Sequence, residues 1–132
     1  MQDALINRPG EVISFKALSF QTRHDGEVFI FFAHDAFSHY ILSTEAARDL
    51  SAATIMRKVN ELMLEKEFLK IVRPPFILVM DICDDLLEEL NLIVEPHGGE
   101  VVFDPQFIDE NMMPDLSSLI EMMARGGVDD GR

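Results

Sequence analysis

The sequence predicts a single α/β domain, and three observations carry that prediction. Its first part alternates β-prone segments with tight turns, which is typical of an antiparallel sheet. Its second part alternates helical and strand patterns, which favours parallel pairing. The 132 residues, 48% of them hydrophobic, are enough to bury one core. We therefore expect one domain over residues 1–125, followed by a flexible tail over residues 126–132.

The first three strands are expected to form an antiparallel meander. Residues 12–22 (VISFKALSFQT) are rich in β-branched and aromatic side chains. Residues 27–34 (EVFIFFAH) are apolar on both faces, so we expect this strand to be covered on both sides. Asp25-Gly26 between them predicts a type I′ turn, in which both residues take a positive φ. Residues 39–43 (HYILS) form the third expected strand.

The pattern then changes to a helical period. Asp49 or Ser51 can cap a helix that runs to about Phe68, because either side chain can accept the free N–H groups of the first turn. The prolines at 74–75 end this unit. Residues 76–80 (FILVM) are a short, wholly apolar run, as expected of a buried parallel strand.

The remaining elements are short. We expect a helix over residues 84–90, strands over 92–94 and 101–103, and a last amphipathic helix over 115–124. The apolar stripe of that last helix is Leu116, Leu119, Ile120 and Met123. Methionine side chains repack easily, so this stripe is the expected contact for a homo-oligomer. The predicted element order is β-β-β-α-β-α-β-α.

The net charge of −13 is concentrated in the C-terminal part. Residues 1–80 hold 10 acidic and 9 basic residues, whereas residues 81–132 hold 14 acidic residues and two arginines. Binding to nucleic acid depends on lysine and arginine contacts with phosphates, so we expect no direct nucleic-acid partner. An acidic surface suits a basic protein partner instead. The basic residues between 57 and 73 alternate with glutamates, which indicates a solvated helix face with ion pairs.

Composition also bears on the compartment. No apolar run approaches the roughly 18 residues of a membrane-spanning helix. A single cysteine, Cys83, fits a reducing compartment. We therefore expect a cytoplasmic protein with no membrane partner.

Two segments point to a known family. Residues 31–42 (FFAHDAFSHYIL) run from an apolar strand into a D-x-F-S-R-Y-like turn, and residues 76–86 (FILVMDICDDL) form an apolar strand that ends in an aspartate. Both segments resemble the catalytic cores of integrases and transposases, and the likeness in element order extends over about residues 12–124. The resemblance implies a ribonuclease H-like α/β fold, with a mixed five-stranded sheet flanked by helices. Three of its strands would be the antiparallel meander and the others parallel.

The same resemblance implies metal-assisted phosphoryl transfer by three carboxylates. In that family the first lies within the first strand, the second at the end of the fourth, and the third on the last helix. Carried over to this chain, the second position is Asp81, the first is Ala17, and the third is Glu110 or Glu121. An alanine methyl group cannot bind a metal ion. We therefore expect vestigial positions without catalysis, metal or cofactor, in a domain kept as an acidic protein-interaction or regulatory module.

An alternative stays open, in which the carboxylates have moved. Asp81 together with Asp35, Asp85 or Glu110 would then hold Mg²⁺ or Mn²⁺ for a nuclease or phosphotransferase. Against this, acidic residues near 84–89 are also what the positive end of a helix favours, with the glutamates facing water.

Another set of candidate metal ligands combines one predicted turn with Cys83. His34, Asp35 and His39 lie at one predicted turn, but zinc would need a third or fourth protein ligand. Aspartate commonly bonds the backbone of its own turn, so we interpret this group as turn residues. Cys83 has aspartate neighbours that disfavour its thiolate, so we interpret it as structural.

Overall fold

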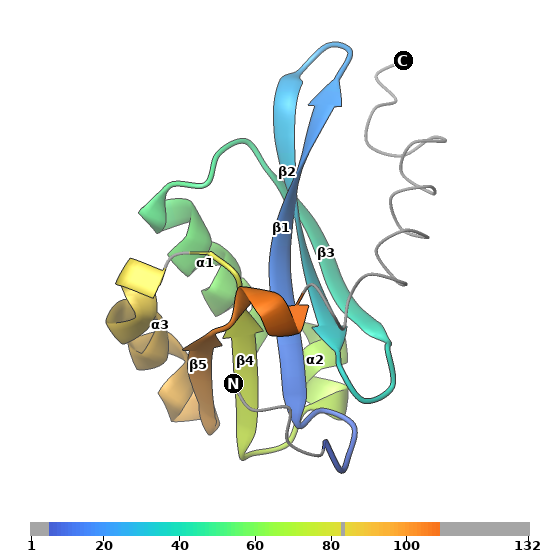
Figure 1. Cartoon of the computed structure of the whole chain (residues 1–132), viewed down its shortest axis with the longest axis vertical. Coiled ribbons are helices and arrows are strands. Elements are labelled where there is room, and N and C mark those ends of the chain that lie inside the picture. Colours follow the sequence, from blue (N-terminus) through green and yellow to red (C-terminus); the bar gives the residue numbers. More distant parts are fainter. Residues whose placement is uncertain (1–5, 83, 109–132) are drawn as a thin grey trace.

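The computed structural model describes residues 6–82 and 84–108, and five strands in it form one mixed sheet (Figure 1). In chain order they are β1 (Val12–Thr22), β2 (Gly26–Asp35), β3 (Ile41–Ala47), β4 (Phe76–Met80) and β5 (Gly99–Phe103). Their order across the sheet is β3-β2-β1-β4-β5. β1 runs antiparallel to β2 and parallel to β4, while β5 runs parallel to β4. The expected mixed sheet, with the meander beside parallel strands, is confirmed.

Two helices lie between β3 and β4 in the sequence, and a third helix, with a 3₁₀ turn on each side, lies between β4 and β5. They are α1 (Ala52–Met63), α2 (Lys66–Ile71), α3 (Leu87–Val94) and the short 3₁₀ turns η1 (Asp84–Leu86) and η2 (Glu95–His97). Ser51 caps α1, because its hydroxyl oxygen accepts a hydrogen bond from the Thr54 backbone N–H. Among the described residues, no helix has both the length and the apolar character needed to cross a membrane.

The sheet has an apolar cluster on each face. One cluster joins Ile13, Phe31 and Leu78 to the apolar sides of α1 and α3. The other joins Phe32 and Val79 to Phe107 and Ile108, which lie on a helical turn over residues 105–108. This turn, orange in Figure 1, crosses the sheet on the side away from α1 and α3. Since Phe31 and Phe32 are both fully buried, the expectation that β2 is covered on both sides is confirmed.

Both turns of the meander differ in detail from the prediction. In the first turn, Gly26 has a positive φ of 70° but Asp25 does not, and Thr22 pairs with Gly26, so the hairpin has a three-residue loop and no type I′ turn. The third strand begins at Ile41 and not at His39. His39 has φ 65°, and the Asp35 N–H donates to the Tyr40 carbonyl, so these residues close the turn.

One helical and one strand prediction are also wrong. The helix expected to reach Phe68 breaks at Leu64 and Glu65, whose N–H groups bond carbonyls three residues back and so end α1. The break restarts the chain as α2 and buries Phe68. Residues 92–94, expected as a strand, are the last turn of α3, where Val94 packs in the core. Beside β4, on the side away from β1, the sheet therefore contains one strand, β5, where the sequence predicted two.

Candidate functional site

Register places Lys16 beside Asp81 in the middle of the sheet. β1 and β4 pair from Val12 opposite Ile77 to Phe15 opposite Met80, so the next pair along is Lys16 and Asp81. Side chains alternate between the faces of a strand, so both residues lie on the face that also carries Val79. β4 ends at Met80, which makes Asp81 the first residue beyond a buried parallel strand.

The two side chains form a partly buried ion pair. The Lys16 Nζ lies 2.6 Å from the Asp81 Oδ2, and the exposed fractions of the two side chains are 15% and 11%. The other carboxylate oxygen, Asp81 Oδ1, is buried and has no hydrogen-bond partner among the described residues. Partial burial strengthens the attraction between these charges, because less water screens them. The ammonium therefore supplies the positive charge that holds the Asp81 carboxylate in the sheet.

Ala17 lies on the other face of β1. It packs against the cluster that contains Ile13 and Phe15, next to the helices. The residue opposite Asp81 is therefore Lys16, one position before the residue to which the resemblance pointed. Lys16 is the only charged residue of Val12–Thr22, and this was the signal that sequence reasoning missed.

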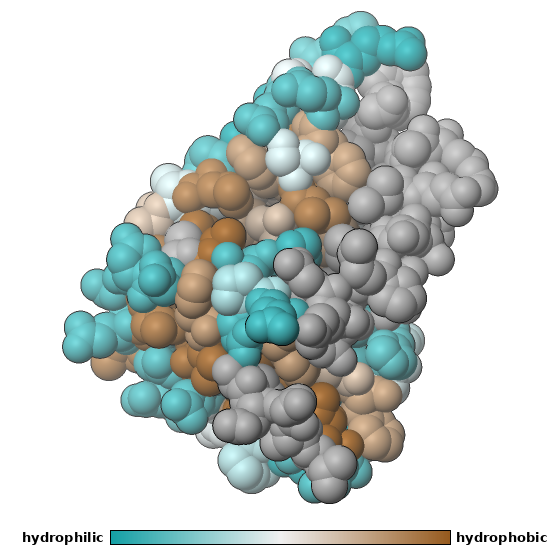
Figure 2. Space-filling view, viewed as in Figure 1, coloured by the Kyte–Doolittle hydropathy of each residue, from teal (hydrophilic) through white to brown (hydrophobic). Residues whose placement is uncertain are grey.

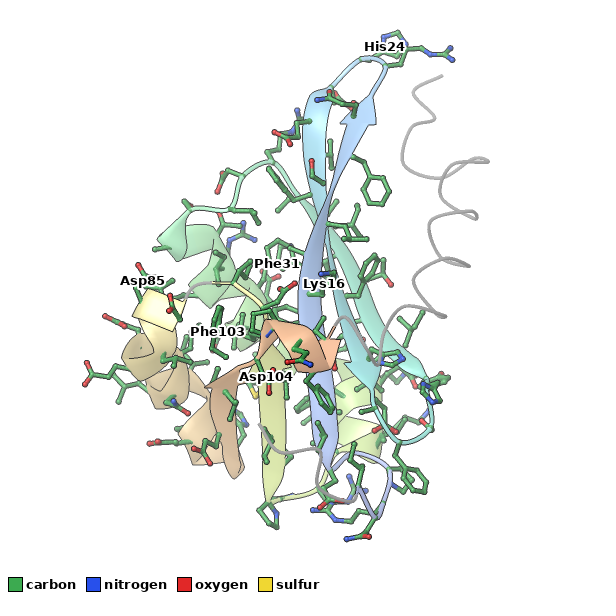
Figure 3. All side chains as sticks on the ribbon, in the orientation of Figure 1. Lys16, His24, Phe31, Asp85, Phe103 and Asp104 are labelled. Atoms are coloured by element: carbon green, nitrogen blue, oxygen red, sulfur yellow. The ribbon has the colours of Figure 1, made fainter. Side chains whose placement is uncertain are left out.

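A second carboxylate follows in the next strand. Phe103 of β5 pairs with Met80, and the Asp104 N–H donates to the Met80 carbonyl at 2.9 Å. Asp104 thus extends the row formed by Lys16 and Asp81, and Figure 3 shows Lys16 and Asp104 near the centre of the sheet. Its Oδ1 accepts a hydrogen bond from the Phe107 N–H at 3.1 Å, so Asp104 also caps the turn over residues 105–108.

Of the carboxylates proposed for a relocated site, Asp35 is engaged elsewhere. It is fully buried, its Oδ1 accepts from the Gly10 N–H at 2.9 Å, and its Oδ2 accepts from the Ser38 hydroxyl at 2.6 Å. These contacts fix the turn between β2 and β3. Asp85 is exposed on η1, and Figure 3 shows it well apart from Lys16 and Asp104.

The two turn histidines lie close together. The ring centres of His34 and His39 are 5.5 Å apart, with His34 buried and His39 exposed. Within residues 6–82 and 84–108, no group of three or more His, Cys, Asp or Glu side chains is arranged to hold a metal ion. Several predicted features lie outside the described residues: Cys83, Glu110, Glu121, the helix with Leu116, Leu119, Ile120 and Met123, and the tail over 126–132.

The mixed-charge helix face differs from the prediction at one lysine. Arg57 pairs with Glu61 at 3.4 Å on an exposed surface, as expected. Lys58, in contrast, is buried, with 8% of its side chain exposed, and its Nζ lies 3.0 Å from the Oε1 of Glu45 on β3. The helical period places residue 58 between Ile55 and Leu62 on the inner side of α1, so its ammonium needs a carboxylate partner from the sheet.

Comparisons with known proteins support the fold. No family model matches the sequence, and no curated protein matches it either. Among solved structures, a chain of the simian T-cell lymphotropic virus intasome, determined in complex with the PP2A regulatory subunit B56 gamma, superposes with a TM-score of 0.64 at 11% identity. The catalytic domain of Mos1 mariner transposase superposes with a TM-score of 0.63, also at 11% identity.

The shared region is most of this chain but only part of the others. The alignment covers 95% of this chain and 46% of the intasome chain, and 91% of this chain and 63% of the transposase chain. At 11% identity such a likeness concerns architecture. Together with the strand order, in which β1 lies between β2 and β4, it shows that this chain has the ribonuclease H-like fold of integrase and transposase catalytic domains.

Proposed function

We propose that this chain is a non-catalytic domain of ribonuclease H-like fold that acts as an acidic protein-interaction or regulatory module. One observation carries the proposal: the side chain beside Asp81 in the sheet, where a metal ion would need a further carboxylate, is that of Lys16, whose Nζ lies 2.6 Å from the Asp81 Oδ2. An ammonium beside the Asp81 carboxylate repels a divalent cation and occupies the space that such an ion needs. The chemistry of the family depends on metal ions held by paired carboxylates.

The charge of the C-terminal part supports an interaction role. Residues 74–124 contain no lysine or arginine. Six acidic side chains are exposed between η1 and β5, namely Asp84, Asp85, Glu88, Glu89, Glu95 and Glu100. Figure 2 shows hydrophilic residues along the α3 side of the molecule. Such a face favours a basic protein partner, whose approach it accelerates electrostatically, and disfavours nucleic acid.

The absence of catalysis is tested by metal titration. We expect the melting temperature of the wild-type protein to show no saturable rise with Mn²⁺ or Mg²⁺, and Asp81→Asn to behave as the wild type does. A specific site filled at 100 times its Kd would add about 2.7 kcal/mol to the free energy of unfolding. A saturable rise that Asp81→Asn abolishes, together with metal-dependent cleavage of a labelled DNA, would overturn the non-catalytic assignment.

The interaction role is tested by charge reversal. A lysine-rich peptide serves as the probe, and its affinity is measured by fluorescence anisotropy at 50 mM and 200 mM salt. We expect Glu88→Lys/Glu89→Lys to weaken binding about tenfold at low salt, because both side chains are exposed on α3. The control, Asp25→Lys/Glu27→Lys, makes the same charge change at the β1–β2 hairpin and should weaken binding less. Equal losses in both variants would show non-specific attraction and count against a dedicated acidic face.

A further inference from the structure

Three segments that are far apart in the sequence meet at one end of the sheet: residues 6–11 before β1, the turn between β2 and β3, and α2 (Figure 1). Residues 6–11 pack on the end of α2, since a Cβ added to Gly10 would lie 2.4 Å from the Ile71 carbonyl oxygen. They are also fixed to the turn, because the Gly10 N–H donates to the buried Asp35 Oδ1 at 2.9 Å. The three segments therefore hold one another in place.

A surface groove lies between these segments. Its volume is about 520 Å³, which is within the range of ligand sites. Tyr40 is 47% exposed in it, and the Tyr40 hydroxyl donates to the Glu67 Oε1 on α2 at 3.3 Å, which fixes the aromatic ring. A fixed, exposed tyrosine ring is a frequent centre of protein interfaces. The lining residues are Pro9, Ser38, Tyr40, Glu67, Lys70 and Ile71.

Two guanidinium groups lie beside the groove without a carboxylate partner. Arg8 directly precedes Pro9, and Arg73 lies two residues after Ile71. The Arg8 guanidinium donates to the backbone carbonyls of Arg73 and Pro75, and the Arg73 guanidinium donates to two carbonyls at the end of α2. Neither forms an ion pair with any described residue. A guanidinium has five N–H donors, so each can still bind a carboxylate.

The carboxylates near the groove are already engaged. Glu67 lies 3.7 Å from the Nζ of Lys70, whose side chain is 64% exposed. The buried Asp35 is hydrogen-bonded within its turn, and the Glu11 carboxylate accepts from the Asn7 N–H at 2.7 Å. The cations therefore have no competing partner among these groups, on a chain whose net charge is −13. A carboxylate from outside is the partner that the unpaired guanidiniums favour.

We propose that this groove binds a short acidic segment of another protein, with a bulky apolar side chain against Tyr40 and carboxylates on Arg8 and Arg73. The apolar walls at Pro9, Tyr40 and Ile71 take the side chain out of water. The guanidiniums beside the groove bind the flanking carboxylates and so fix the direction of the peptide. The groove and the acidic face on α3 use different residues and favour partners of opposite charge, so this inference does not depend on the proposed function.

Tyr40 itself can report binding, because the chain contains one tyrosine and no tryptophan. The probe is an unlabelled peptide of glutamates and serines around one central phenylalanine. We expect it to change the tyrosine emission of the full-length wild type in a saturable way. The same peptide with a central alanine should bind about tenfold more weakly, because it leaves the apolar walls unfilled. A lysine-rich peptide, the probe of the acidic face, should leave the emission unchanged.

Charge reversal tests the cationic side of the groove. Lys70→Glu/Arg73→Glu should weaken binding of the phenylalanine peptide about tenfold at low salt. The matched control, Arg48→Glu/Arg57→Glu, makes the same charge change at exposed residues that do not line the groove, and should weaken binding less. Arg73 also bonds carbonyls at the end of α2, so thermal unfolding is recorded first. Lys70→Glu alone is the milder variant, with an expected loss of about threefold.

Several results contradict the proposal. One is a tyrosine emission that the phenylalanine peptide does not change. Equal affinities for the two acidic peptides would remove the apolar part of the site, and equal losses in the two charge-reversed pairs would remove the cationic part. Emission that changes with protein concentration alone, together with a rise in mass by sedimentation, would assign the groove to a second copy of the chain. If the acidic peptide binds here and the lysine-rich peptide does not bind the acidic face, this inference stands while the proposed function fails.

Discussion

At the scale of single residues, the Lys16–Asp81 pair is the feature with the clearest energetic consequence. Each charge is largely removed from water, with 15% and 11% of the side chains exposed, so each depends on the other. Lys16→Met leaves the Asp81 carboxylate without a cation, while its Oδ1 already lacks a donor among the described residues. We expect this variant to lose about 2 kcal/mol of unfolding free energy, measured by urea denaturation.

The matched comparison is a double-mutant cycle. Lys16→Met/Asp81→Leu removes both charges and fills the site with apolar groups, so it should be more stable than Lys16→Met alone. The second single variant of the cycle, Asp81→Leu, should cost less than Lys16→Met, because a lysine side chain can extend its ammonium toward water. If the three variants differ from the wild type only by independent, additive amounts, the pair contributes no coupling and the assignment of Lys16 as the partner of Asp81 fails.

At the scale of elements, the start of α1 supplies a pH-dependent contact. The Thr54 hydroxyl donates to the Asp49 Oδ1 at 2.6 Å and the Ser51 N–H donates at 3.0 Å, which together lower the pKa of Asp49 from 3.8 to about 2. A pKa that falls on folding stabilises the protein above the unfolded value, and this contribution is lost as pH drops through about 2. Thr54→Val removes the largest cause, so the pKa of Asp49 should rise toward 3.8 in an NMR titration. Thr22→Val, at the exposed end of β1, should leave it unchanged, and an unshifted Asp49 in Thr54→Val would contradict this account.

Elements with a clear period could be predicted, whereas their ends and partners could not. Val12–Thr22 and Phe76–Met80 were predicted with their observed bounds, because β-branched, aromatic and apolar runs mark strands locally. Residues 92–94 are equally apolar but continue α3, since burial of Val94 in the helical layer decides their state.

The pairing of Lys16 with Asp81 was not predicted, for a related reason. Which residue of β1 lies opposite Asp81 depends on register, and register is a property of two strands and not of one sequence segment.

At the scale of the whole molecule, the uneven charge predicts a response to salt. Residues 81–132 hold 14 acidic and two basic residues, and among the described residues six of these acidic side chains are exposed between η1 and β5, so repulsion among them opposes the compact state. Monovalent salt screens these exposed charges, with a Debye length near 10 Å at 0.1 M, but screens the partly buried Lys16–Asp81 and Lys58–Glu45 pairs much less. The balance therefore favours stabilisation by salt, and we expect the melting temperature to rise between 20 mM and 200 mM NaCl, measured by calorimetry.

The control variant is Glu88→Gln/Glu89→Gln. It should start from a higher melting temperature at 20 mM NaCl and rise less, because part of the repulsion is already removed. A melting temperature that falls with salt would instead mean that attractive surface ion pairs, such as Arg57–Glu61, outweigh the repulsion of the acidic side.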